Sequence, residues 1–242
     1  MKESHCNKSE PQNFMHMRKL LFTGIALALF LDADAQLDLP PIGGNPRAMI
    51  SEEVGITSIT IKYSRPDVSG REGKIWGILI TNGFSTQSFI TNQNTAPWRA
   101  GANENTIITF EHDVKLEGKP VKAGSYGLHI AWWPDSALII LSNQTAAWGS
   151  FYYEDKYDAL RVKVKPVALE KSVEWLKYEF IEHKEKHCVI ALQWEKVSIP
   201  FKVEVDVENI VYARLKEQAT SLAGFSSNNM VQASQYLLNK NI

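Results

Sequence analysis

The sequence predicts an all-β protein, an antiparallel β-sandwich of the jelly-roll-like or immunoglobulin-like kind with a short α-helical C-terminal appendage. Short segments with apolar residues at every second position recur between Ile59 and Val207. Gly and Pro residues punctuate these segments, and no helical crossover separates them before Glu208. Strands that follow one another without crossover helices pair antiparallel, and two such sheets can pack face to face around one core.

The first clear strand comes from Ile59, Ile61 and Tyr63, which alternate with polar residues until Pro66. Before it, residues 36–47 are rich in Pro and Gly and predict an extended lead-in. Further strands are expected over residues 106–110, 137–142, 160–164, 176–180, 188–194 and 199–207, with a strand-turn-strand unit over 114–130. Helical spacing of apolar residues then predicts helices over residues 210–222 and 228–238.

The N-terminus has the three parts of a secretory signal. Residues 17–19 are Met-Arg-Lys, residues 20–31 form an apolar run, and residues 33–35 are Ala-Asp-Ala. The sequence therefore predicts cleavage before Gln36 and export to the periplasm or beyond. The apolar run is shorter than the roughly 20 residues that span a bilayer, so the mature chain is expected to have no transmembrane segment. The expected organisation is an N-terminal extension and signal peptide over 1–35, a sandwich domain over 36–208 and a helical tail over 209–242.

Charge and cysteine content narrow the function classes. The 26 Lys and Arg residues balance 27 Asp and Glu residues, which argues against nucleic acid as a partner. Only Cys188 remains after the expected cleavage, so no intramolecular disulfide is expected. Because Cys188 alternates in register with Ile190 and Leu192, we expect it to be a small core residue.

Several segments resemble the uncharacterised secreted bacterial family catalogued as domain of unknown function 2911. They are Tyr-Ser-Arg-Pro at 63–66, Gly-Arg at 70–71, Ile-Trp-Gly at 75–77, Trp-Arg-Ala-Gly-Ala-Asn-Glu at 98–104, Ala-Gly-Ser-Tyr at 123–126, Trp-Gly at 148–149 and Leu-Arg at 160–161. The resemblance spans roughly residues 41–206, and the run at 98–104 is its most specific part. It implies an exported β-sheet domain and carries no catalytic residues.

The leading candidate site is the segment that contains Trp98, Arg99, Asn103 and Glu104, just before an expected strand. Arg99 can pair with a carboxylate or phosphate, Asn103 can orient a ligand, and Trp98 offers a stacking face. The alternative is structural: Arg99 and Glu104 would satisfy loop backbone groups, while Trp98 would close one end of the core.

Two further ligand-binding elements are expected. His129 should point away from the face of Tyr126 and Leu128, toward a cleft with Glu104 or His112. Trp148 and Tyr152 belong to an aromatic cluster that would bind sugar or, alternatively, close the open end of the sandwich. His183 and His187 flank a polar turn and are not expected to bind metal. No cofactor is expected. Neither a phosphate loop nor a Gly-x-Ser-x-Gly elbow is present, which argues against nucleotide and acyl-transfer chemistry.

These sequence features are compatible with three functions. The favoured one is a non-enzymatic module that binds a small-molecule or carbohydrate ligand or another envelope component. The alternative is a cell-envelope hydrolase acting on carbohydrate or cell-wall material, with Glu104 and either Glu111, Asp113 or His129 as its acid and base. The third is a scaffold whose helical tail over residues 209–242 binds a protein partner. Whether the chain is an enzyme stays open at this point.

Overall fold

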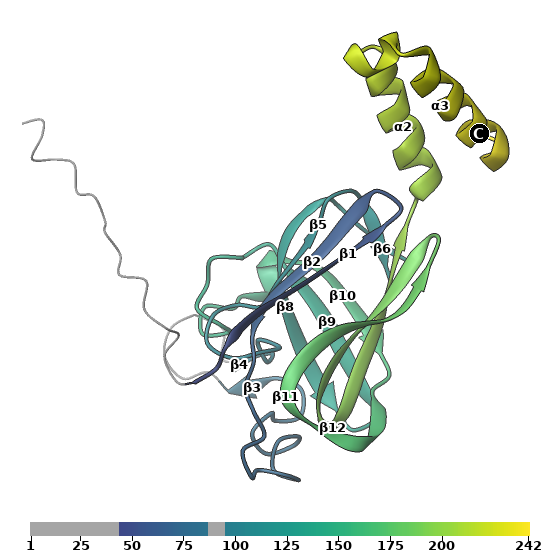
Figure 1. Cartoon of the computed structure of the whole chain (residues 1–242). Helices are drawn as coiled ribbons and strands as arrows, with labels where there is room; N and C mark the ends of the chain where they lie inside the picture. The colour runs from purple at the N-terminus through teal and green to yellow at the C-terminus, as the bar shows by residue number, and fades with distance from the viewer. Residues whose placement is uncertain (1–43, 87–94) are drawn as a thin grey trace, which may run out of the picture. The chain divides into compact units, whose positions relative to one another are not determined.

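The computed structural model describes residues 44–86 and 95–242, so the expected signal and the cleavage site before Gln36 lie outside the described residues. The described chain is mainly antiparallel β-sheet with two helices at its C-terminal end (Figure 1). The sheets are open rather than closed into a barrel, and both contribute side chains to one large core. The expected all-β, sandwich-like fold class is confirmed.

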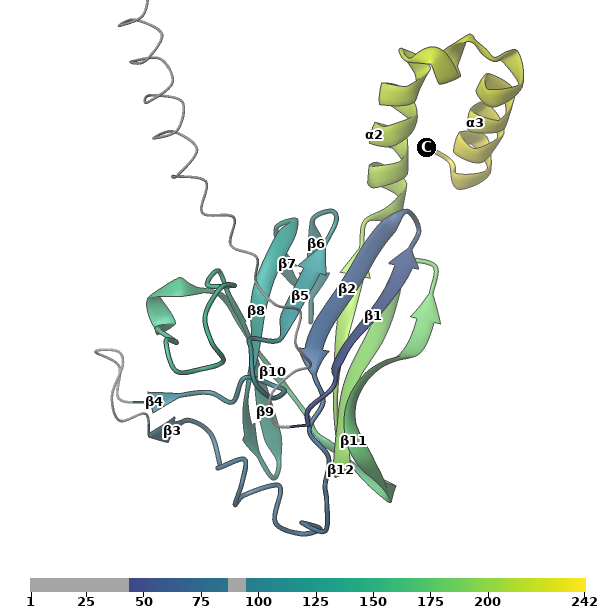
Figure 2. The same ribbon diagram turned by 60° about the vertical axis from the view of Figure 1, so that its left-hand side comes forward.

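The larger sheet has six strands in the order β1-β2-β5-β8-β9-β10. Their bounds are Arg47–Val54, Thr57–Ser64, Ile107–Phe110, Gly124–Trp133, Ser136–Ser142 and Asp158–Val164. The smaller sheet has the order β11-β12-β6-β7, with bounds Val167–Lys184, His187–Val205, Val114–Leu116 and Lys119–Val121. A separate ribbon pairs β3 (Ser85–Thr86) with β4 (Thr95–Ala96). The edge strand β1 lies beside β11 of the other sheet (Figure 2).

Alternation predicts correctly which face of a strand is buried. Tyr126, Leu128 and Ile130 on β8 enter the main core, and His129 points to the opposite face. Cys188 is fully buried, as expected for a small core residue. The same rule explains β2, where Ile59 and Ile61 are buried and Lys62 is exposed. The alternation of side chains along each strand therefore explains why one face of each sheet is buried.

Two strands differ from expectation. Strand β1 was not predicted from the sequence. Ala48, Ile50 and Glu52 alternate on its inward face, and the charged Glu52 breaks the apolar pattern. The expected strands over 188–194 and 199–207 are one strand, β12. The buried positions of β12 change from even-numbered to odd-numbered residues around Glu195, which adopts a φ of 50° and lies between two register shifts against β11. Such an irregularity changes the face that the side chains occupy without ending the strand, which is why the pattern looks like two strands.

The two expected helices are confirmed with shifted bounds, as α2 (Val207–Ala219) and α3 (Ser227–Lys240). Asp206 and Ser226 cap them by accepting hydrogen bonds from Asn209 N and Asn229 N. Two short 3-10 turns, η1 (Asp155–Tyr157) and η2 (Leu222–Phe225), complete the described elements. Within residues 44–86 and 95–242, no helix has the length and apolar character needed to cross a membrane. The expected protein partner of this helical tail stays a prediction.

Candidate functional site

A cleft of about 440 Å³ lies where three loop segments meet strand β12. Its walls come from residues 66–71, residues 79–80, residues 98–103 and Trp194, with Asn45 at one side. Cavities that hold small molecules commonly measure roughly 300–1,000 Å³, so this volume suits a small ligand. Three residues of the predicted patch line the cleft, namely Trp98, Arg99 and Asn103.

The first wall, residues 65–74, is fastened to the smaller sheet. Arg65 Nε donates to Leu176 O at 2.8 Å, and Ser69 N donates to the Glu174 carboxylate at 2.8 Å. Gly73 N donates to Glu195 Oε1 at 2.5 Å. These bonds join residues more than a hundred positions apart along the chain. The loop therefore has a fixed course relative to β11 and β12, and the cleft is preformed.

Two tryptophans, Trp98 and Trp194, line the cleft, and Trp76 packs against both. Trp98 stacks on Trp194 with ring centroids 6.0 Å apart and an angle of 20° between the planes. Trp76 meets Trp98 edge-on at 5.7 Å and Trp194 at 6.3 Å. Trp98 Nε1 donates to Gly101 O at 3.1 Å, while its backbone pairs with Ile130 of β8. Trp98 thus packs on the core and also lines the cleft, so it can both close one end of the core and offer a stacking face to a ligand.

Arg99 is a half-buried cation. Its Nη1 donates to Asn103 O at 2.7 Å, and its guanidinium lies 5.0 Å from the ring centroid of Phe151. Burial lowers the pKa of Arg99 from its ordinary value. No carboxylate of the described residues forms an ion pair with it. A cation in this setting favours an anionic partner, since burial without one is costly.

The turn between Trp98 and Glu104 is held from several sides. Ala100 and Asn103 both adopt positive φ values, 52° and 57°. Ala100 O accepts from Tyr178 Oη at 2.8 Å and from Thr106 Oγ1 at 3.2 Å. Asn103 Oδ1 accepts from Asn45 Nδ2 at 3.3 Å. The strained conformation is fixed by these long-range bonds, as is common where a loop presents functional groups.

A family model described as "Protein of unknown function (DUF2911)" matches residues 45–203, more than half of the chain. The chain belongs to the DUF2911 family. The resemblance seen in the sequence is thereby confirmed, and every residue that lines the cleft lies within the matched range of this DUF2911 protein. No curated protein and no solved structure matches the chain. Membership assigns no activity, so the function has to be argued from the site.

Glu104 of the DUF2911 protein does not join the cleft. Its carboxylate forms an ion pair with Arg47 and accepts from Ser64 Oγ at 3.0 Å. It lines a neighbouring groove with Arg47 and Lys62. Burial raises the pKa of Glu104, but the hydrogen bonds from Arg47 and Ser64 outweigh burial and hold it below its ordinary value. Of the four residues of the predicted patch, Trp98, Arg99 and Asn103 line the cleft, and Glu104 lines the neighbouring groove.

His129 does not reach a cleft with Glu104 or His112, contrary to expectation. It is 2% exposed, its Nδ1 lies 3.2 Å from Ser150 Oγ, and its ring meets Tyr153 edge-on at 5.2 Å. Burial, assisted by the charge of Arg99, lowers the pKa of His129 to about 4. His112 bonds instead to Thr57 at 3.1 Å. The alternation correctly predicted the face of His129, but the loop that covers this face could not be predicted.

The segment at 148–153 does meet the segment at 98–104, through side chains other than those expected. Phe151 lies against Arg99, and Gly149 approaches its guanidinium so closely that a Cβ atom there would be 2.5 Å from Nη1. Trp148 and Tyr152, the expected sugar-binding residues, are 52% and 44% exposed. Their binding role stays a prediction. The contacts of Gly149 and Phe151 leave no periodic signal in the sequence.

A buried polar group holds this loop onto β10. Asp158 Oδ2 accepts from Tyr153 Oη at 2.7 Å and from Arg161 Nε at 2.6 Å. Burial raises the pKa of Asp158, although both hydrogen bonds act in the opposite direction. Burial and the neighbouring carboxylate also raise the pKa of Tyr153. These contacts hold in place the loop that covers His129. The same loop carries Phe151, which lies against Arg99.

Metal ligands are not gathered in the described part of the DUF2911 chain. Across residues 44–86 and 95–242, no group of three or more His, Cys, Asp or Glu side chains is placed to hold a metal ion. His183 and His187 flank the turn between β11 and β12, where they bond to Glu52 at 2.6 Å and Glu182 at 3.0 Å. Their carboxylate partners belong to the sandwich surface and do not converge on one point.

Proposed function

We propose that this DUF2911 protein is an exported, non-enzymatic binding module whose cleft holds a small anionic ligand. The observation that carries the proposal is the position of Arg99, which lines the cleft without a carboxylate partner among the described residues. A guanidinium presents a planar fork of N–H donors that matches a carboxylate or a phosphate. Only one of these donors is engaged by Asn103 O, so others are available to a ligand.

The other charged groups of the cleft support an anionic ligand. Asp67 is the acidic residue in the cleft wall, and its Oδ1 lies 3.3 Å from Arg71 Nη2. Arg71 is further fixed by donating to Asp67 O and Val68 O at 2.7 and 2.9 Å. Because Arg71 neutralises Asp67, the net charge of the cleft comes from Arg99. The partial burial of Arg99 strengthens its attraction for an anion, since water screens the charge less there.

The hydrolase alternative receives no support from the positions of its carboxylates. Glu104 pairs with Arg47, Glu111 accepts from Ser58 N at 3.0 Å, and Asp113 pairs with Lys122 at 2.7 Å. A glycosidase acid must carry a proton near neutral pH, whereas the pKa of Glu104 and that of Asp113 are both lowered by their partners. Neither residue lines the cleft. A binding module is therefore the better reading of this arrangement.

Export is the second part of the proposal and rests on the signal-like residues 17–35. Expression of the full chain in a Gram-negative host should yield a periplasmic protein whose N-terminal residue is Gln36. Edman sequencing of the periplasmic fraction measures this directly. A variant with Ala33→Glu and Ala35→Glu should accumulate uncleaved, because a signal peptidase needs small residues there. Recovery of the intact, uncleaved wild-type chain in the cytoplasm would contradict export.

The binding proposal is tested by Arg99→Leu. The melting temperature of the chain from Gln36 onward is measured against inorganic phosphate, glucuronate and benzoate, with glucose and benzyl alcohol as neutral counterparts. A bound anion should raise the melting temperature by mass action. We expect Arg99→Leu to weaken anion binding at least about tenfold, because a charge-assisted hydrogen bond contributes about 1.5–3 kcal/mol.

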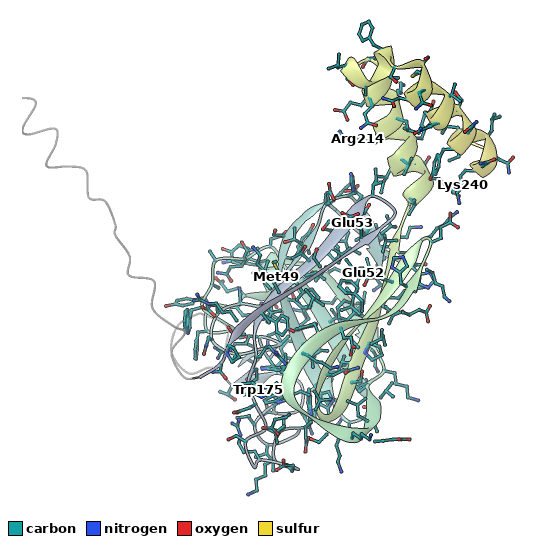
Figure 3. The ribbon with its side chains drawn as sticks, in the orientation of Figure 1. Met49, Glu52, Glu53, Trp175, Arg214 and Lys240 are labelled. Carbon is teal, nitrogen blue, oxygen red and sulfur yellow. The ribbon has the colours of Figure 1, made fainter. Side chains whose placement is uncertain are left out.

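Two variants serve as controls for this experiment. Arg214→Leu removes an arginine of α2, the first of the two C-terminal helices (Figure 3), where it pairs with Glu217, and should leave binding unchanged. Arg99→Lys keeps the charge and should retain part of the affinity, which guards against a simple folding defect in Arg99→Leu. Equal affinity of wild type and Arg99→Leu for every anion would overturn the proposal, as would failure of all anions to bind wild type.

A further inference from the structure

The turn between the two C-terminal helices displays two large apolar side chains to solvent. Leu222 and Phe225, which both lie in η2, are 87% and 89% exposed. No other large hydrophobic side chain in residues 44–86 and 95–242 is as exposed. Contiguous apolar surface on a folded protein commonly marks an interaction site, because such surface is unfavourable in water. The turn is therefore a candidate for contact with another molecule.

Local contacts hold this turn in one conformation. Asn229 Nδ2 donates to Ala223 O at 3.1 Å, which ties the start of α3 to the turn. Gly224 fits against the end of α2 so closely that a Cβ atom there would collide with Ala219 O. Only glycine leaves room for this approach. The outward position of the neighbouring Phe225 is thus a consequence of how the turn is built.

An uncharged groove of about 390 Å³ lies beside the turn, between α2 and α3, which run side by side in Figures 1 and 2. Its apolar walls include Leu215, Met230 and Tyr236, and the small side chains of Ala219 and Ala233 keep it open. None of the described residues that line the groove is charged. Helix α3 has no buried residue, so the tail does not fill the groove with its own side chains.

We infer that this surface is a self-association site, at which the turn of one copy packs into the groove of a second copy. One patch carries both the protruding ring of Phe225 and a groove that can receive it. In a two-fold pair the same patch of both copies is opposed, so the ring and the groove are each used twice. The inference goes beyond the proposed function, because none of these residues lines the cleft of Arg99.

Charge and area both suit a second copy. Residues 218–239 contain no charged side chain, so two identical surfaces meet without facing like charges. An aromatic side chain buries roughly 150–250 Å². With both Phe225 rings, both Leu222 side chains and the groove walls that they cover, the contact removes on the order of 1,000 Å² from water. Specific interfaces begin at about this size, so the dimer should be weak and should depend on protein concentration.

The test is sedimentation equilibrium of the chain from Gln36 onward, from low to high micromolar concentration. Wild type should convert from monomer to dimer across this range. Phe225→Asp removes the ring, and Ala233→Trp fills the groove, so each should weaken dimerisation at least about tenfold. The control is Leu238→Asp, the same kind of change at a residue that is 76% exposed on α3 but outside the groove. It should dimerise as wild type does.

A photo-crosslink identifies the surface that the turn contacts. Phe225 is replaced by p-benzoylphenylalanine, which links to neighbouring groups under ultraviolet light, and the covalent dimer is mapped by mass spectrometry. We expect the linked peptide to lie within residues 211–236 of the second copy, which contain the groove. Links to any other surface would overturn the inference.

Three results of the sedimentation experiment would also overturn self-association at this site. They are a wild type that stays monomeric at every concentration, dimers that survive both Phe225→Asp and Ala233→Trp, and equal weakening by Leu238→Asp, which indicates unspecific apolar association. Phe225→Asp should bind anions as wild type does, because Phe225 does not line the cleft. The binding proposal and this inference can therefore fail separately.

Discussion

Acidification should destabilise the protein through His129, by about 3 kcal/mol in total between pH 6.5 and pH 4. Above pH 6.5 the imidazole is neutral in both states, so its contribution to stability is complete. Between these two values the unfolded chain binds a proton that the folded protein does not, and stability falls as the pH falls. Below the folded pKa of about 4 both states are protonated, and the loss is complete.

The measurement is the free energy of unfolding in urea at several values between pH 7 and pH 4, for wild type and His129→Gln. Carboxylates and the other histidines titrate in both proteins, so their contribution cancels in the difference between the two curves. We expect a shallower decline for His129→Gln, whatever its stability at pH 7. Parallel curves would show that His129 becomes protonated in the folded state as readily as in the unfolded chain, in conflict with its burial between Ser150 and Tyr153.

Trp76→Ala should cost about 3 kcal/mol of stability, at the lower end of the range for Trp→Ala because Trp76 is only partly buried. The indole contacts Trp98, Trp132 and Trp194, and its Nε1 donates to Trp194 O. Its removal leaves a cavity among these three tryptophans that the surrounding β-strands cannot close. The loss is measured as the change in the free energy of unfolding in urea at pH 7.

Trp148→Ala is the matched control for Trp76→Ala. It removes the same side chain from a site that is 52% exposed, so the expected cost is below about 1 kcal/mol. Binding separates the two variants further, since Trp76→Ala should also weaken anion binding by loosening Trp98 and Trp194. Similar losses of stability in both variants would contradict the central place of Trp76 in the tryptophan cluster.

By itself the sequence determined the fold class, the family, the buried face of several strands and the two C-terminal helices. Side chains alternate across a strand, so the apolar period revealed that His129 and Leu128 point to opposite faces and that Cys188 is buried. Helical spacing revealed α2 and α3 to within a few residues. Local composition also directed attention to Trp98, Arg99 and Asn103, which do line the cleft.

Only the tertiary structure decided what these residues meet. Alternation says which face a residue occupies but nothing about which strand pairs with which, so the ion pair of Glu104 with Arg47 on the unpredicted strand β1 had no local signal. The same holds for Trp194 of β12, which stacks on Trp98, and for Phe151, which reaches Arg99 from the loop before β10. These contacts join distant segments, and their energies come from packing and desolvation that exist only once both sheets are assembled.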